Sequence, residues 1–322
     1  MNFPIVLATD KNYLVPTYVA ISSLLRHLDA KMKDRIDIYI LCSSSIDNNQ
    51  KEYFNKLHKN IYFEEVHLSK LNLSDEIDYV SMATYYRLLI PEKFRQYDKC
   101  LYLDSDIVVV GDITPLVQME FGNNLIIGCK NYFSKECYTD FYKQRCRECG
   151  IDSLDTYVNA GVLLINIKEL RNEEIGITML QDVSKNTYRY NDQDIINKYF
   201  YGKIGLMSAK YNFMVQYLKR MEIISKVLKE DLYEVVKEPV IIHYSTKKKP
   251  WRHRGYLMAE YWEDEIKHIE DVEVVRDLIK PFIIKQRKSR RIYEIILDNL
   301  KFVLRKYVQH NFTYTIQKKH YK

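Results

Sequence analysis

The first 66 residues alternate short β-rich runs with segments of helical periodicity, and this alternation most limits the fold. Residues 4–8, 36–42 and 61–66 are rich in the apolar, β-branched and aromatic residues typical of strands. Residues 15–28 and 48–58, between them, carry apolar residues at helical spacing. Strands and helices that alternate in this way form a mostly parallel sheet with helices on both faces. The sequence therefore predicts an α/β fold.

Length and composition fit one large α/β domain with an appendage. Of the 322 residues, 47% are hydrophobic and 29% charged, which is ordinary for a soluble globular protein. Neither a secretion signal nor an apolar stretch of membrane-spanning length is present, which predicts a cytoplasmic protein. The six cysteines are then expected to be free thiols, because the CxxC pair Cys146 and Cys149 has no second metal-binding pair nearby.

Residues 101–110, LYLDSDIVVV, place two aspartates between two β-rich runs. Residues two apart in an extended chain lie on the same side, so Asp104 and Asp106 are predicted to present both carboxylates together at the end of a buried strand. A hard divalent cation would stabilise two anions there. The alternative is an Asx-type turn, in which the aspartates only cap a backbone bend.

Polar residues at other element ends allow two interpretations each. Asp10, Asn12 and Tyr13 follow the first strand, where α/β sheets bind ligands, and they either contact a heterocycle or start a helix. Arg87 lies on a helix predicted over residues 82–90, ending before Pro91. It either binds an anionic ligand or a carboxylate, or forms an ion pair within the protein.

The second half of the chain adds three polar motifs. Asn159 precedes the small Ala160-Gly161 pair at the start of a buried strand, where a ligand could approach the backbone closely. In the stretch Asn191–Asp194, Asn191 or Asp192 is expected to be an N-cap, or the side chains cradle a sugar. His243 ends the strand predicted over residues 240–244, and would be a ligand only if the fold brings it beside the aspartates. The remaining predictions are a strand over 125–129, a polar insertion without regular periodicity over 130–150, and a helix over about 169–184.

No GxGxxG or GxxxxGK[ST] loop follows the early strands, which argues against dinucleotide and Walker phosphate sites. Six motifs instead occur in the order found in glycosyltransferase family 8, and the chain resembles that family over about residues 4–251. They are ATDKNY, MATYYRL, LYLDSDIVV, YVNAGVLLINI, NDQDIIN and HYSTKKKPW. The nearest resemblance is to bacterial α-galactosyltransferase-like members that build surface oligosaccharides. It implies a GT-A fold with a mixed central sheet flanked by helices, a catalytic domain over 1–265 and a helical, basic appendage over 266–322.

The resemblance also implies the site residues. Asp104, Asp106 and His243 would bind Mn²⁺, with Mg²⁺ as an alternative. Asp192 and Gln193 would be catalytic, and Lys249 would contact the diphosphate of a UDP-sugar, although Thr246 replaces a glycine usual in its loop. The full set of residues implied in donor binding is Ala8, Asp10, Asn12, Tyr13, Arg87, Asp104, Ser105, Asn159, Ala160, Asp192, Gln193 and Lys249.

The implied reaction is retaining transfer of a hexose, with galactose favoured, from a UDP-hexose to an oligosaccharide, glycolipid or glycoprotein acceptor. UDP-glucose is the alternative donor. A sugar nucleotidyltransferase is the alternative enzyme, although ATDKNY lacks the Gly-rich triphosphate loop it would need. The family has an amide at the position of Gln193, and an amide is a poor nucleophile. Front-face attack by the acceptor is therefore favoured over a covalent carboxylate intermediate.

The chain carries a net charge of +6, and its positive excess lies in the tail. Residues 281–322 contain eleven Lys and Arg and two acidic residues. One predicted helical face there is apolar, formed by Ile292, Ile296, Leu300, Val303, Leu304 and Tyr307. Residues 282–322 are predicted either to bind an anionic membrane surface, on the inner face of the cell membrane, or to pack on the enzyme. No nucleic-acid partner is expected, because the first 280 residues are slightly acidic.

Overall fold

The computed structural model describes residues 2–43, 46–68, 82–132, 139–288 and 300. The chain separates into two compact units. The first comprises Met1–Phe213 and Lys219–His243, and the second comprises Met214–Leu218 and Tyr244–Lys322. The domain boundary expected at residue 265 stays a prediction.

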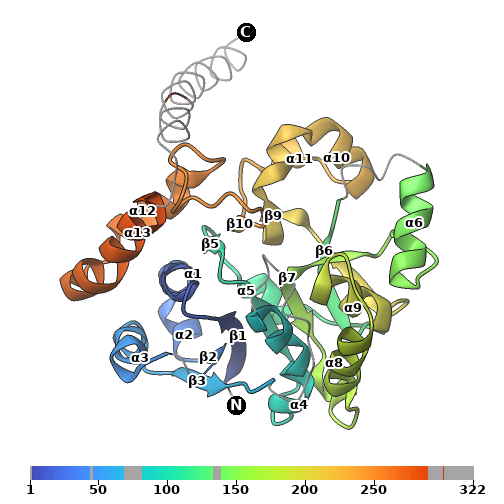
Figure 1. The fold of residues 1–322 in the computed structure, drawn as a ribbon, viewed down its shortest axis with the longest axis horizontal. Coiled ribbons are helices and arrows are strands. Elements are labelled where there is room, and N and C mark those ends of the chain that lie inside the picture. The colour runs from blue at the N-terminus through green and yellow to red at the C-terminus, as the bar shows by residue number, and fades with distance from the viewer. Residues whose placement is uncertain (1, 44–45, 69–81, 133–138, 289–299, 301–322) are drawn as a thin grey trace. The chain divides into compact units, whose positions relative to one another are not determined.

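A seven-stranded sheet forms the centre of the first unit, in the order β3-β2-β1-β4-β7-β6-β8 (Figure 1). The strands β3, β2, β1 and β4 run parallel, β7 is antiparallel to β4 and β6, and β8 is parallel to β6. This mixed, mostly parallel sheet confirms the predicted α/β fold. The strands are β1 (Phe3–Thr9), β2 (Ile36–Cys42), β3 (Ile61–Glu65), β4 (Cys100–Leu103), β6 (Ile126–Lys130), β7 (Val158–Ile165) and β8 (Ile204–Met207).

The middle of this sheet is closed to water on both faces. All four residues of β4 and all eight of β7 are buried, as expected for apolar runs covered from two sides. Their register places Tyr102 opposite Val6 of β1 and Leu163 of β7. Burial of each such Val or Leu side chain stabilises the fold by roughly 1.5–3 kcal/mol. The polar residues that end these strands are thereby held on rigid supports.

A second, three-stranded sheet has the order β5-β10-β9. Its strands are β5 (Ile107–Val109), β10 (Ile241–His243) and β9 (Phe213–Met214). β5 follows the aspartate segment directly, and β10 pairs with it in antiparallel register, so that His243 lies opposite Ile107. This pairing brings together two segments more than 130 residues apart in the chain.

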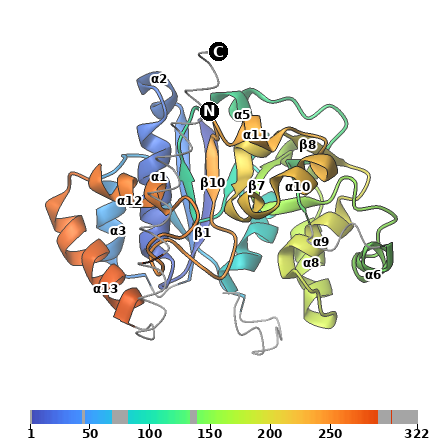
Figure 2. The ribbon, with the colours of Figure 1, turned by 90° about the horizontal axis from the view of Figure 1, so that it is seen from above.

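The helices of the first unit are mostly those predicted. The structure contains α1 over Leu14–Arg26 and α3 over Asn48–Asn55, near the predicted bounds. Figures 1 and 2 show α1, α2 and α3 beside β1 and β2, and α8 next to α9. The others are α2 (Ala30–Lys33), α4 (Ile90–Lys93), α5 (Thr114–Gln118), α6 (Thr139–Cys149), α7 (Ile167–Leu170), α8 (Ile175–Lys185), α9 (Asn191–Tyr199), α10 (Met221–Leu228), α11 (Leu232–Val235) and the 3₁₀ helices η1 (Met82–Leu89) and η2 (Ala209–Asn212).

Three local predictions were wrong, and a fourth was right in its bounds but not in its helix type. The helix predicted over residues 82–90, ending before Pro91, is the 3₁₀ helix η1, which ends at Leu89; Pro91 lies in the first turn of α4, where proline is tolerated. The insertion over residues 130–150 contains α6. The helix predicted over residues 169–184 is divided into α7 and α8. At α9 the N-cap is Tyr190, so neither Asn191 nor Asp192 caps this helix.

The described part of the second unit is largely helical. It contains most of η3 (Val215–Lys219), α12 (Ala259–Lys267), the π-helix η4 (Val274–Ile279) and α13 (Lys280–Lys288). Trp251 packs against Trp262, with 5.6 Å between ring centroids, and against Phe282 at 6.3 Å. Within the described residues, none of the helices has the length and apolar character needed to cross a bilayer. Apart from Leu300, the predicted apolar face of the tail lies outside the described residues.

Candidate active site

Asp104, Asp106 and His243 converge at one point of the first unit. One ligand atom from each lies within 4.8 Å of the other two. The His243 Nε2 atom is 3.2 Å from Asp106 Oδ1 and 3.6 Å from Asp104 Oδ2. His243 is buried, and the aspartate side chains are 20% and 12% exposed, so the cluster stays accessible from one side. The predicted convergence of these three side chains is confirmed, and metal binding by them stays a prediction.

The route to this convergence differs from the one predicted. Residues 104–106 form a turn between β4 and β5, not an extended segment. The turn is anchored by the Asp104 backbone N–H, which donates to the Gly161 carbonyl at 2.8 Å. The Ser105 hydroxyl, which is buried, donates to the Ala8 carbonyl at 2.7 Å. Pairing of β5 with β10 then places His243 beside the turn.

Gly161 makes room for the cluster. A Cβ atom at this position would lie 2.3 Å from His243 Cε1 and 2.8 Å from Asp104 Oδ2, distances that side chains do not tolerate. The close approach that the sequence suggested for a ligand is therefore made by the protein's own side chains. Mixed carboxylate and imidazole donors suit Mn²⁺, and the missing Cβ lets them meet, so these residues fit a divalent cation.

Arg87 lies between two carboxylates. Its guanidinium is 2.8 Å from Asp104 Oδ1 and 3.0 Å from Asp192 Oδ2, and it donates to the Ala160 carbonyl at 2.7 Å. The Thr84 hydroxyl donates to Asp192 at 2.9 Å. Of the two interpretations of Arg87, the structure shows the internal ion pair. The arginine joins one residue of the candidate metal site to the start of α9.

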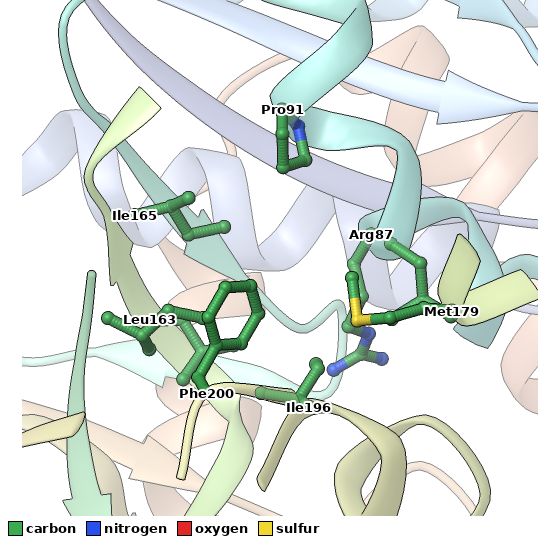
Figure 3. A pocket seen from close by; sticks show the side chains of 9 residues that line it. Arg87, Pro91, Leu163, Ile165, Met179, Ile196 and Phe200 are labelled. Atoms are coloured by element: carbon green, nitrogen blue, oxygen red, sulfur yellow. The ribbon is translucent and has the colours of Figure 1, made fainter. Parts of the chain in front are cut away.

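Apolar side chains cover the other side of Arg87. Figure 3 shows a small pocket lined by Arg87 with Leu163, Met179, Ile196 and Phe200. Burial by itself would lower the pKa of Arg87, but Asp104 and Asp192 outweigh it and raise that pKa above its ordinary value. Burial, partly offset by Arg87, raises the pKa of Asp192 to about 6. The two carboxylates share one buried guanidinium, with Asp192 buried beside it and Asp104 partly exposed.

Asn159 and Gln193 are bound to each other. The Asn159 amide nitrogen donates to Gln193 Oε1 at 2.8 Å, and the Ala160 backbone N–H donates to the same oxygen at 3.3 Å. The Gln193 amide nitrogen donates to the Tyr157 hydroxyl at 3.1 Å. These bonds hold the Gln193 side chain in one orientation at the end of β7.

A second polar cluster, missed in the sequence, lies behind Gln193. Asp194 and Arg145 form an ion pair in which both side chains are buried, and the Tyr157 hydroxyl donates to Asp194. The Arg145 guanidinium also pairs with Glu148 on the same helix. Arg145 lies on α6, inside the insertion in which the sequence shows no regular periodicity. No sequence signal indicated its partner, 49 residues away.

The loop after β1 has the structure of a helix start. The Asp10 carboxylate accepts hydrogen bonds from the backbone N–H groups of Asn12, at 2.7 Å, and Tyr13, at 3.0 Å. This is the second of the two interpretations of that motif. Contact of Ala8, Asp10, Asn12 and Tyr13 with a uridine stays a prediction.

Lys249 belongs to the second unit. Its ammonium group is buried and donates to the Tyr244 carbonyl at 2.6 Å. Thr246, in the position where a glycine was expected, bonds the Lys248 carbonyl at 3.1 Å and the Tyr256 hydroxyl. The loop is therefore held by its own hydrogen bonds. Contact of Lys249 with a diphosphate stays a prediction.

The comparison with protein families identifies the chain. The family model "Glycosyl transferase family 8" matches residues 4–255, most of its length. The chain belongs to glycosyltransferase family 8. The predicted family and GT-A fold are thereby confirmed.

Relatives within family 8 are bacterial glycosyltransferases. Glycosyltransferase GlyE of Streptococcus pneumoniae is 28% identical over 80% of this chain and 60% of its own length. A lipopolysaccharide 1,2-glucosyltransferase of Escherichia coli is 26% identical over 94% of this chain and 88% of its own. A lipopolysaccharide 1,3-galactosyltransferase of Salmonella typhimurium is 28% identical, over 81% of this chain and 77% of its own.

Solved structures of family 8 enzymes share the fold. The galactosyltransferase LgtC, in complex with donor and acceptor sugar analogs, superimposes with a TM-score of 0.68 and 26% identity. The match covers 84% of this chain and 97% of LgtC. The bifunctional glycosyltransferase WbbM has a TM-score of 0.69 and 25% identity, and the chain spans 52% of its length.

Proposed function

We propose that this family 8 enzyme is a metal-dependent, retaining hexosyltransferase that uses a UDP-sugar and builds a surface glycan. The observation that supports this most directly is the convergence of Asp104, Asp106 and His243 within 4.8 Å. Asp104 also contacts Arg87, which contacts Asp192 at the start of α9. A candidate cation site and a candidate sugar site thus share one aspartate.

Each of these residues has a distinct task in the proposed reaction. Asp104, Asp106 and His243 would hold Mn²⁺, which when bound supplies positive charge against the negative charge that grows on the departing diphosphate. Asp192 would accept hydrogen bonds from the hexose. Gln193, whose amide is held by Asn159 and Ala160, would form a rigid wall beside the anomeric carbon. Such fixed polar groups orient substrate without reorganising during the reaction.

Retention of configuration is proposed to occur by front-face attack of the acceptor hydroxyl. Gln193 is an amide, and its oxygen already accepts two hydrogen bonds. Both facts disfavour it as a nucleophile. The acceptor oxygen would bond the anomeric carbon as the bond from that carbon to the diphosphate breaks. The acceptor proton would pass to the leaving phosphate oxygen.

Galactose is the proposed donor sugar, with glucose as the alternative, because relatives of both kinds match this chain at similar identity. Lys249 is proposed to contact the diphosphate, and Ala8, Asp10, Asn12 and Tyr13 to bind the uridine. The acceptor is proposed to be an oligosaccharide, a glycolipid or a glycoprotein.

Residues 282–322 are proposed to bind anionic membrane. Their deletion should release the protein from anionic vesicles while UDP release continues.

The test is UDP release by the purified chain. UDP-galactose and UDP-glucose are supplied separately, each with Mn²⁺, with Mg²⁺ or with EDTA. Mn²⁺-dependent release from one donor, faster for UDP-galactose, is the expected result. An absence of both UDP release and UDP binding with every donor would contradict the proposal. Pyrophosphate release from UTP and a sugar 1-phosphate would instead identify a nucleotidyltransferase.

A further inference from the structure

A buried line of hydrogen bonds connects the β7 backbone to His243. The Gly161 N–H donates to Asn159 Oδ1 at 2.9 Å, and the Asn212 amide nitrogen donates to the same oxygen at 2.8 Å. Asn212 Oδ1 then contacts His243 Nδ1 at 2.8 Å. Asn212 ends η2 and is fully buried, and His243 is 2% exposed. No role was predicted for Asn212 from the sequence.

The direction of every bond in this line follows from its first member. A backbone N–H can only donate, so the Asn159 atom that faces Gly161 must be its oxygen. The Asn212 atom that faces this oxygen must then be the amide nitrogen, because two oxygens cannot share a hydrogen bond here without a proton. Asn212 therefore presents its oxygen to His243, and only a proton on Nδ1 can satisfy that oxygen.

The proton on Nδ1 of His243 determines whether Nε2 has a lone pair that can bind a metal ion. A neutral imidazole carries one proton, so a ring protonated on Nδ1 has a lone pair on Nε2. Nε2 is the atom that faces Asp106 and Asp104, at 3.2 and 3.6 Å. A ring without a partner at Nδ1 would instead carry its proton on Nε2, where Asp106 could accept it. That tautomer has no lone pair on Nε2 with which to bind a cation beside the aspartates.

We propose that Asn212 is a positioning residue that sets His243 in the Nδ1–H tautomer and orientation needed for a metal ligand. The proposal deepens the proposed function, since it rests on His243 as a ligand. The Gly161 N–H fixes the orientation of the Asn159 amide. Asn159 in turn fixes the orientation of Asn212, which favours the Nδ1–H tautomer. The same Asn159 side chain donates to Gln193, so one amide orients both the candidate ligand and the candidate catalytic residue.

The tautomer is measured first, in metal-free protein. ¹⁵N-histidine labelling reports which ring nitrogen carries the proton, at a pH high enough that the ring shifts no longer change. The His243 signals are assigned by their loss in His243→Gln. Wild-type protein should show Nδ1–H, and Asn212→Leu should shift the population to Nε2–H. Nε2–H in the wild-type protein would overturn the proposal, whether or not Asn212→Leu folds.

Mn²⁺ affinity, measured by titration calorimetry, provides the second test. Loss of a side chain that orients a metal-bound histidine typically costs 10–100-fold in affinity, and we expect a loss in this range for Asn212→Leu. Asn212→Asp should lose less affinity than Asn212→Leu, because one carboxylate oxygen still accepts the Nδ1 proton although the bond donated to Asn159 is lost. A role in packing alone predicts the reverse order, since leucine fills the space without introducing a charge. That order would overturn the proposal.

The two tests separate this proposal from the proposed function. If wild-type protein shows the Nδ1–H tautomer but binds neither Mn²⁺ nor Mg²⁺, the orienting role of Asn212 stands and the metal-dependent reaction does not. If wild-type protein binds Mn²⁺ and Asn212→Leu binds it equally well, the reaction stands and the role of Asn212 does not.

Discussion

Two acidic clusters in the first unit differ in how the protein encloses them. Around Asp194 the carboxylate is 1% exposed and paired with Arg145, which is itself fully buried. At Asp104 and Asp106 the carboxylates are 20% and 12% exposed, and they face His243. Each cluster has a buried arginine partner, Arg145 for Asp194 and Arg87 for Asp104, but only the second cluster keeps its carboxylates partly exposed. The burial of the carboxylates, more than their presence, therefore distinguishes a cluster that supports the structure from a candidate site.

Removing the arginine from the closed cluster should have the largest effect. Arg145→Met leaves Asp194 buried without its ion-pair partner. We expect the free energy of unfolding to fall by about 3–5 kcal/mol, as for other broken buried pairs. Urea denaturation followed by circular dichroism measures the loss. The matched control is Arg171→Met, since that half-buried arginine pairs with the exposed Asp98 and should cost less than the Arg145 change, about 1 kcal/mol. Equal losses would erase the distinction between the clusters.

A substitution in the accessible cluster should lower enzyme activity and leave the stability of the protein nearly unchanged. Asp106→Asn keeps the size of the side chain but removes one charged ligand. Donor turnover should fall on the order of 100-fold or more, since metal assistance contributes several kcal/mol to such reactions. The unfolding free energy of the metal-free protein should change by about 1 kcal/mol or less. UDP release assays and urea denaturation measure the two quantities. Asp98→Asn, at an exposed position, is the control, and full activity in Asp106→Asn would contradict this assignment.

Asp192, which Arg87 links to Asp104, should make the free energy of unfolding depend on pH. Its folded-state pKa is about 6, above an unfolded value of about 3.9, so the folded state holds the proton more tightly. The stability of wild-type protein relative to Asp192→Asn is therefore greatest below about pH 4. It should decline by up to about 3 kcal/mol as pH rises to 6 and then stay level. Urea denaturation of both metal-free proteins across this range measures the difference, and a rise with pH would contradict the assignment.

The addition of a single methyl group at Gly161 should have the smallest effect of the four changes. Gly161→Ala forces His243 and Asp104 apart, because the new Cβ would lie 2.3 and 2.8 Å from them. Mn²⁺ affinity should fall about 10–100-fold, the range seen when ligand orientation is lost. Gly128→Ala on β6 is the control: its Cβ would lie nearest to the side chains of Leu163 and Val158, each at 3.0 Å. That variant should lose stability but bind Mn²⁺ as the wild type does, whereas equal affinities in all three proteins would show that Gly161 has no such role.

The sequence alone predicted the parallel half of the sheet, because local propensity and burial agree there. The strand predicted over residues 36–42 has the observed bounds, the one over 4–8 is one residue longer at each end, and the one over 61–66 ends one residue earlier. The predictions failed where distant contacts dominate. α6 has a polar face to solvent and is anchored by Arg145 to Asp194, which no periodicity reveals.

The site was predicted in part. Order and spacing of the motifs pointed to Asp104, Asp106 and His243, but the expected extended geometry is a turn closed by β5 pairing with β10. Arg87 was expected either to bind a ligand or to form an internal ion pair, and the ion pair is present. Asn159 bonds Gln193 and Asn212, and contact of either residue with a donor stays a prediction. Asn212 was absent from the prediction, because an asparagine before a short strand has no distinguishing local pattern.

The sequence by itself determined the family, the α/β class and the residue types of the candidate site, since these depend on short-range order along the chain. Tertiary structure alone decided which amides orient Gln193 and His243 and which acids remain accessible. The physical reason is that hydrogen-bond direction and burial depend on partners that lie tens of residues apart in sequence and meet only after the sheet has formed.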